Sequence, residues 1–115
     1  MSLATDRAAI AAALDAVTDI TGYDDQPSML SPGDAWVRWG GFDAAGPVLT
    51  FMTIWRIWVV CGGTPQDAMT FLDTHLADVL DAIDQLVYVT GVQPVEIQIS
   101  GGVTYGAEIT AQKES

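Results

Sequence analysis

The chain has 115 residues, half of them hydrophobic, and its fifteen acidic residues outnumber four basic ones, which gives a formal net charge of −11. A chain of this length and hydrophobic content is expected to fold as one domain over residues 1–115, with a single core. Its anionic surface repels phosphate, which excludes a conventional nucleic-acid-binding module and a module that binds anionic membranes.

The first predicted element is a helix from Thr5 to Val17, because its large apolar residues recur at helical spacing and form a narrow stripe. The opposite face is mainly alanine, which either fills a solvated helix surface or lets a neighbouring element approach closely. The next residues, Thr18 to Asp34, are rich in Gly, Pro and Asp and predict an irregular connection.

A short strand is predicted from Ala35 to Trp39, followed by a flexible tip with the sequence GGFDAAGP, residues 40–47. Eight residues are more than a tight hairpin needs, so Gly41, Phe42 and Asp43 are candidates for an interaction loop. The alternative is a plain mobile tip.

The stretch Val48 to Cys61 predicts one long strand, because its fourteen residues are dominated by β-branched and aromatic types. Alternation places Trp55, Ile57 and their odd-numbered neighbours on one face, which we expect to join the core. The even-numbered face combines apolar side chains with one arginine and indicates a surface that another protein covers. Its candidate interface residues are Met52, Ile54, Arg56 and Trp58.

A second helix is predicted from Pro65 to about Leu86, with Thr64 as the N-cap and Asp67 three residues later in a capping-box position. Phe71 and His75 lie off the apolar face of this helix. They either contact another subunit or are covered by a loop of the same chain.

The segment Val87 to Val92 is ambiguous between a strand and a connection, and the alternating residues after it predict an antiparallel hairpin that turns at Gly101-Gly102. We expect the hairpin to bury one face, and residues 112–115 to be frayed. The predicted fold class is α+β, a mainly antiparallel sheet of about four strands with two helices packed on one face.

No catalytic constellation, cofactor motif or metal-binding motif is recognisable, so we expect no enzyme, no cofactor and no metal site. Asp78, Asp81 and Asp84 follow the single histidine, but positions three apart rotate by about 60° on a helix, so their carboxylates diverge. This acidic ridge either serves solubility or forms a surface along which a polyanion slides without adsorbing. Cys61 falls on the core face, which indicates a buried structural thiol.

The longest apolar run is interrupted by Arg56 and falls short of the roughly 20 residues of a membrane span. The first residues, MSLATDRAAI, lack the basic and then apolar order of a secretion signal. We therefore expect no membrane partner and synthesis in the cytoplasm.

Five segments together resemble the tail terminator proteins of long-tailed (siphovirus) bacteriophages, particularly those of actinobacterial hosts. These segments are RAAIAAALDAV, TGY with PGDAWVRW, TFMTIWRIWVV, GGTPQDAMTFLDTHLADVLDAI and PVEIQISGGVTYGAEIT. The resemblance lies in element order, length and texture over nearly the whole chain.

The resemblance implies a structural virion protein at the head-to-tail junction, assembled in the host cytoplasm. Its copies would form a ring, usually a hexamer, that caps the tail tube, ends tube growth and joins the head–tail connector. The implied partners are the chain itself, the tail-tube protein and the connector or stopper protein, and DNA passes through without specific binding. The acidic ridge then becomes a candidate wall of the DNA channel.

Two alternatives remain open. Another neck or tail-tube component would have a similar architecture. A small intracellular enzyme or ligand-binding domain is the alternative from a different class, with an apolar pocket lined by Trp36, Trp39, Trp55 and Trp58.

Overall fold

A computed structural model describes residues 3–45 and 50–114. Over these residues the fold is α+β, with two helices and one five-stranded, mostly antiparallel sheet. The elements are α1 (Leu3–Asp15), β1 (Thr21–Tyr23), β2 (Asp34–Ala45), β3 (Thr50–Gly62), α2 (Pro65–Ile83), β4 (Tyr88–Ile99) and β5 (Gly102–Glu114). The strand order is β1-β2-β3-β5-β4, in which only the β1–β2 pair is parallel within the described part of the chain.

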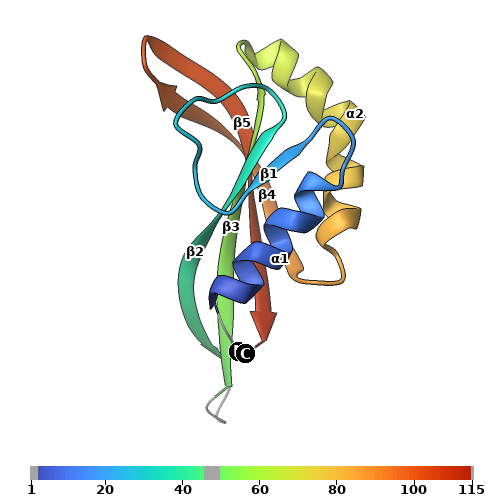
Figure 1. The fold of residues 1–115 in the computed structure, drawn as a ribbon, viewed down its shortest axis with the longest axis vertical. Helices are drawn as coiled ribbons and strands as arrows, with labels where there is room; N and C mark the ends of the chain where they lie inside the picture. Colours follow the sequence, from blue (N-terminus) through green and yellow to red (C-terminus); the bar gives the residue numbers. More distant parts are fainter. Residues whose placement is uncertain (1–2, 46–49, 115) are drawn as a thin grey trace.

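The core forms between the helices and one face of the sheet, and Figure 1 shows α1 and α2 on the same side of that sheet. The predicted alternation of β3 is confirmed, because Trp55, Ile57 and Val59 are almost completely buried. Leu14 of α1 and Ile83 of α2 belong to the same buried cluster. We call the opposite side of the sheet the open face.

The N-terminus of α2 is the predicted one. Thr64 is the N-cap in an extended conformation, its Oγ1 accepts a hydrogen bond from the Asp67 backbone N–H at 3.1 Å, and Pro65 opens the helix. A hydroxyl acceptor and a proline at these positions satisfy the first turn without using a side-chain partner from elsewhere. The helix ends at Ile83, a few residues before the predicted end.

The predicted number of strands is wrong, because the segment expected to be irregular contributes β1, which pairs with the first residues of β2. The predicted loop is also wrong in part. Gly41, Phe42 and Asp43 lie in β2 and pair with β3, with a register shift between Trp39 and Gly41. Residues 46–49 of the predicted tip lie outside the described residues.

The terminal hairpin has its predicted turn, but its two apolar stripes lie on opposite faces of the sheet. Ala107 and Ile109 of β5 are buried on the helix side. Val95 and Ile97 of β4 pair with Gly106 and Thr104, so their side chains lie on the open face. The ambiguous segment Val87 to Val92 belongs to β4 from Tyr88 onward, and residues 112–114, which we expected to be frayed, continue β5.

The acidic residues of α2 generate a stability prediction, because the first turn carries Asp67 while the last turn carries Asp81 and no basic residue. A negative charge stabilises a helix N-terminus and destabilises a C-terminus, each by about 0.3–1 kcal/mol. Asp67→Asn is therefore expected to lower the free energy of unfolding, and Asp81→Asn to raise it, in urea titrations. The two variants remove the same charge, so shifts of the same sign would contradict this account.

Candidate functional site: the open face of the sheet

Three predicted interface residues of β3, Ile54, Arg56 and Trp58, are half-buried on the open face, as is Met52 nearer the start of the strand. Val60, on the same face, is 1% exposed, and the Gly33 N–H donates to its carbonyl at 2.8 Å, so the backbone preceding β2 runs alongside this end of β3. The open face is therefore covered by the chain itself near the end of β3 and only partly covered along the rest.

Trp58 is held between two side chains of β2. Its ring lies 5.6 Å from the ring of the buried Trp36, and the guanidinium carbon of Arg38 lies 4.8 Å from its centroid. A guanidinium at this distance from an indole face makes a cation–π contact. The Trp58 indole N–H in turn donates to Oε2 of Glu108 at 2.8 Å, so the ring orientation is fixed from three directions.

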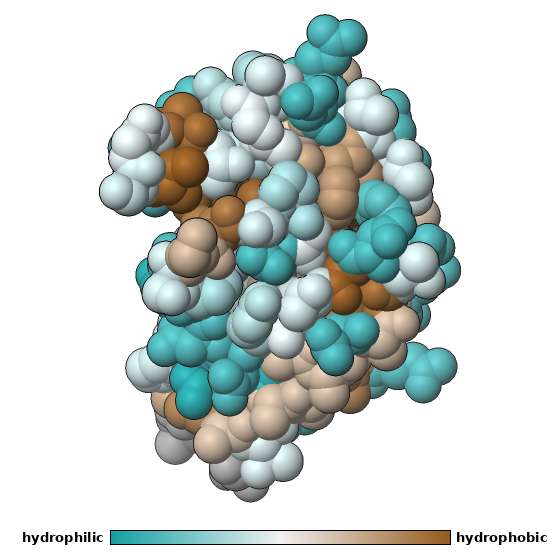
Figure 2. Space-filling view, turned by 45° about the horizontal axis from the view of Figure 1, so that its top comes forward, coloured by the Kyte–Doolittle hydropathy of each residue, from teal (hydrophilic) through white to brown (hydrophobic). Residues whose placement is uncertain are grey.

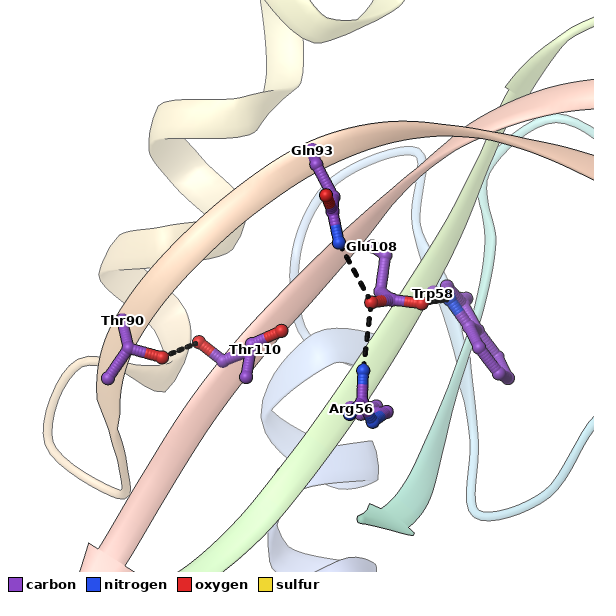
Figure 3. Close-up of polar contacts among 6 residues, drawn as sticks. All are labelled: Arg56, Trp58, Thr90, Gln93, Glu108 and Thr110. Carbon is purple, nitrogen blue, oxygen red and sulfur yellow. Dashed lines mark hydrogen bonds and ion pairs between the residues drawn. The ribbon is translucent and has the colours of Figure 1, made fainter.

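Glu108 of β5 is the polar centre of the open face (Figure 3). Its Oε1 accepts from Arg56 Nη1 at 3.1 Å and from Gln93 Nε2 at 3.3 Å, and its side chain is only 12% exposed. Charge-assisted hydrogen bonds from three donors offset the desolvation of this carboxylate. Farther along β4, Thr90 Oγ1 donates to the Thr110 carbonyl at 3.2 Å and links the same two strands beside the register shift between Val89 and Gly91.

Beside this cluster the surface is hollowed by a groove of about 310 Å³, a volume near the lower end of small-ligand sites. A second hollow of about 390 Å³ continues it between the 26–30 segment and the tip of the hairpin. Figure 2 shows an indentation at the left edge of the molecule. The projection above this indentation carries hydrophobic surface. The residues that line the first groove are Gln26, Trp36, Arg38, Trp58, Val95, Glu96, Ile97, Gln98 and Glu108.

The four tryptophans that we considered as a pocket lining lie on two different faces. Trp36 and Trp58 pair across β2 and β3 on the open face, while Trp39 and Trp55 pair on the helix side. They therefore do not line one common pocket. Trp39 is 45% exposed and stacks edge-on against Phe42 at 5.2 Å, because the extra residue between Trp39 and Gly41 brings both rings to the same side.

Phe71 and His75 have contacts within the same chain. Phe71 packs against the buried core cluster, and its ring centroid lies 4.5 Å from that of His75. His75 Nε2 lies 3.9 Å from a carboxylate oxygen of Asp19, in the connection after α1. These contacts correspond to coverage by the same chain, the second of our two interpretations, and a contact with another subunit stays a prediction.

The acidic ridge of Asp78, Asp81 and Asp84 is exposed along the outer side of α2. Within the described residues, no group of three or more His, Cys, Asp or Glu side chains is arranged to hold a metal ion. No helix in this part of the chain has the length and hydropathy needed to cross a membrane.

Cys61 is buried, and burial raises its pKa to about 11, which disfavours a reactive thiolate.

The sequence indicated Arg56 and Trp58 but not their partners on neighbouring strands. Glu108 was visible only as a polar residue in the alternation of the terminal hairpin. Its position opposite Trp58 depends on the pairing of β3 with β5, which includes a register shift between Val60 and Gly62. Arg38 and Trp36 were likewise visible in a short strand, without a signal that they stack on Trp58.

Among known proteins, no family model and no curated sequence matches this chain.

The Glu108 cluster generates a prediction about stability. Glu108→Ala leaves the half-buried Arg56 and Trp58 indole N–H without this acceptor, and a hydrogen bond to a charged group contributes about 1.5–3 kcal/mol. We expect a loss of that size in the free energy of unfolding from urea titrations. Glu108→Gln keeps an acceptor oxygen and is expected to lose less. Glu96→Ala, an exposed acid one strand away, is the control and should change stability by less than about 0.5 kcal/mol.

Proposed function

We propose that this chain is a structural protein of a bacteriophage virion that forms a homo-oligomeric ring, hexameric by the resemblance, at the head-to-tail junction. The ring caps the tail tube, ends its polymerisation and joins it to the head–tail connector. The chain acts in this proposal by assembly and not by catalysis, and it is incorporated in the host cytoplasm.

The observation that carries the proposal is the half-buried stretch of the open face around Ile54 and Trp58. The buried cluster between the helices and the helix side of the sheet does not include these apolar side chains. Hydrophobic surface that a small domain does not cover itself is typical of an interface. Assembly with sister copies is the use that agrees with the resemblance in element order.

The net charge supports the second part of the proposal, the passage of DNA. Six chains at −11 each would carry −66, and a channel wall of that sign does not adsorb phosphate. The ridge of Asp78, Asp81 and Asp84 is exposed and paired with no basic side chain within the described residues. It therefore remains our candidate for the surface that faces the DNA.

The assembly is tested with Ile54→Asp, which places a charge on the half-buried part of the open face. We expect the wild-type chain to form rings, alone or on the ends of tail tubes, in light scattering and negative-stain electron microscopy. Ile54→Asp is expected to keep its far-ultraviolet circular dichroism and to lose the rings. A variant that is folded and still forms rings would exclude this face as the interface.

The matched control is Met69→Asp, which makes the same chemical change at a 68% exposed residue of α2 on the helix side. It is expected to form rings like the wild type. Loss of rings in both variants would indicate a general effect of added charge and would not support the open face specifically.

The DNA-facing ridge is tested by changing Asp78, Asp81 and Asp84 together to Lys, with the triple Asn variant as the control. Lysine attracts phosphate while asparagine only removes repulsion, so we expect the Lys variant to slow genome ejection and to lower infectivity by about tenfold or more. The Asn variant should lie close to the wild type. Wild-type infectivity in the Lys variant would leave solubility as the role of the ridge.

A ligand-binding domain is the second candidate, and the groove of about 310 Å³ on the open face is the observation that favours it. A strict monomer whose melting temperature rises with a small-molecule ligand, and that does not bind tail tubes, would support this candidate over the ring.

A further inference from the structure

Arg38 and Arg56 lie directly opposite each other on β2 and β3. Like charges in this position destabilise a pair of strands unless an acid compensates them. Glu108 is the acid at this place, and it pairs with Arg56 at 3.1 Å. Arg38 is exposed, lies over the Trp58 ring at 4.8 Å, and makes no ion pair with any described residue.

The open face therefore carries a local surplus of one positive charge on a chain whose net charge is −11. The next acids in register on this face, Asp43 and Glu114, are both opposite Met52. They lie four residues along β3 from Arg56, or about 13 Å away at the rise of an extended strand. That distance exceeds the Debye length of about 8 Å at physiological ionic strength, so these acids do not neutralise Arg38.

The groove next to Arg38 has the features of a site for a carboxylate on an apolar stem. Val95 and Ile97 form an apolar wall, and Gln26, from the segment before β2, also lines the groove. The buried indole N–H of Trp36, in the same lining, has no acceptor among the described residues. Glu96 pairs with Tyr105, so alternation directs its side chain to the helix side of the sheet.

We propose that this groove holds an acidic side chain of a neighbouring copy, whose carboxylate pairs with Arg38 across the subunit interface. The proposal rests on the ring proposed above and identifies the charged contact within it. A guanidinium already positioned by stacking loses less side-chain entropy when it binds a carboxylate, and it suits bidentate pairing.

The occupant is a second copy because of the charge balance of the chain. Copies at −11 repel one another, so their association is favoured where a cation of one copy meets an acid of the next. Arg56 and Lys113 are already paired with Glu108 and Asp6 of their own chain. Arg38 is the cation on the half-buried face that remains for such a contact within the described residues.

The test compares ring assembly of the wild type, Arg38→Ala and Arg7→Ala by sedimentation velocity at about 50 mM and about 500 mM salt. Both variants lose one positive charge, but Arg7 lies on α1, outside the groove. We expect Arg38→Ala to weaken assembly by about tenfold at low salt, with a smaller difference at high salt because salt screens the lost pair. Arg7→Ala should assemble like the wild type, and Arg38→Lys, which keeps the charge without the planar stack, should lie between.

Rings of Arg38→Ala with wild-type stability at both salt concentrations would overturn the groove contact and leave the ring itself intact. A weakening shared equally by Arg7→Ala would also overturn it, because net charge alone would then be the cause. A wild-type chain that stays monomeric both alone and with tail tubes would instead count against the proposed function. Thermal unfolding of each variant separates lost assembly from lost folding.

Discussion

The structure depends on one sheet that is apolar on both faces while its helices cover only one. Both helices lie on one side of the sheet (Figure 1). Trp55 and Ile57 of β3 are buried in one cluster with residues of α1 and α2, whereas Ile54 and Trp58 of the same strand are half-buried on the other side. The described residues contain no further helix or strand with which to cover a second hydrophobic face, and the chain covers that face fully only around Trp36 and Val60. The asymmetry between the two faces is therefore the physical basis for expecting a partner on the open one.

The open face is ordered by polar contacts although it is not fully buried. Glu108 fixes both Arg56 and the Trp58 indole, and Trp36 and Arg38 hold the same ring from the neighbouring strand. Side chains that are already positioned lose little conformational entropy when a partner binds. A rigid aromatic surface with a fixed cation therefore suits specific association better than a mobile apolar surface of equal area.

The sequence was sufficient for features that depend on residue type and spacing alone. Alternation in β3 predicted its buried face, and the Thr64-Pro65 boundary predicted the start of α2. The sequence was insufficient where pairing between strands overrides the local conformational preference of the residues. The Gly-rich residues after Trp39 indicate a turn, but β2 continues along β3 through Ala45. Alternation in the hairpin showed which residues share a face but not which face, because the register depends on irregularities such as that between Val89 and Gly91.

The distribution of charge also bears on the symmetry of an assembly through the open face. A two-fold contact would place this face against itself, so the acid that meets Arg38 would have to come from the same face, where Glu108 is already engaged by Arg56 and Asp43 and Glu114 lie opposite Met52. A heterologous contact instead places the open face against a different surface of the next copy, and most of the charged side chains on this chain are acidic. Heterologous contacts that close on themselves generate rings. A heterologous contact therefore offers Arg38 more acidic partners than a two-fold contact does, and the proposed ring agrees with this distribution of charge.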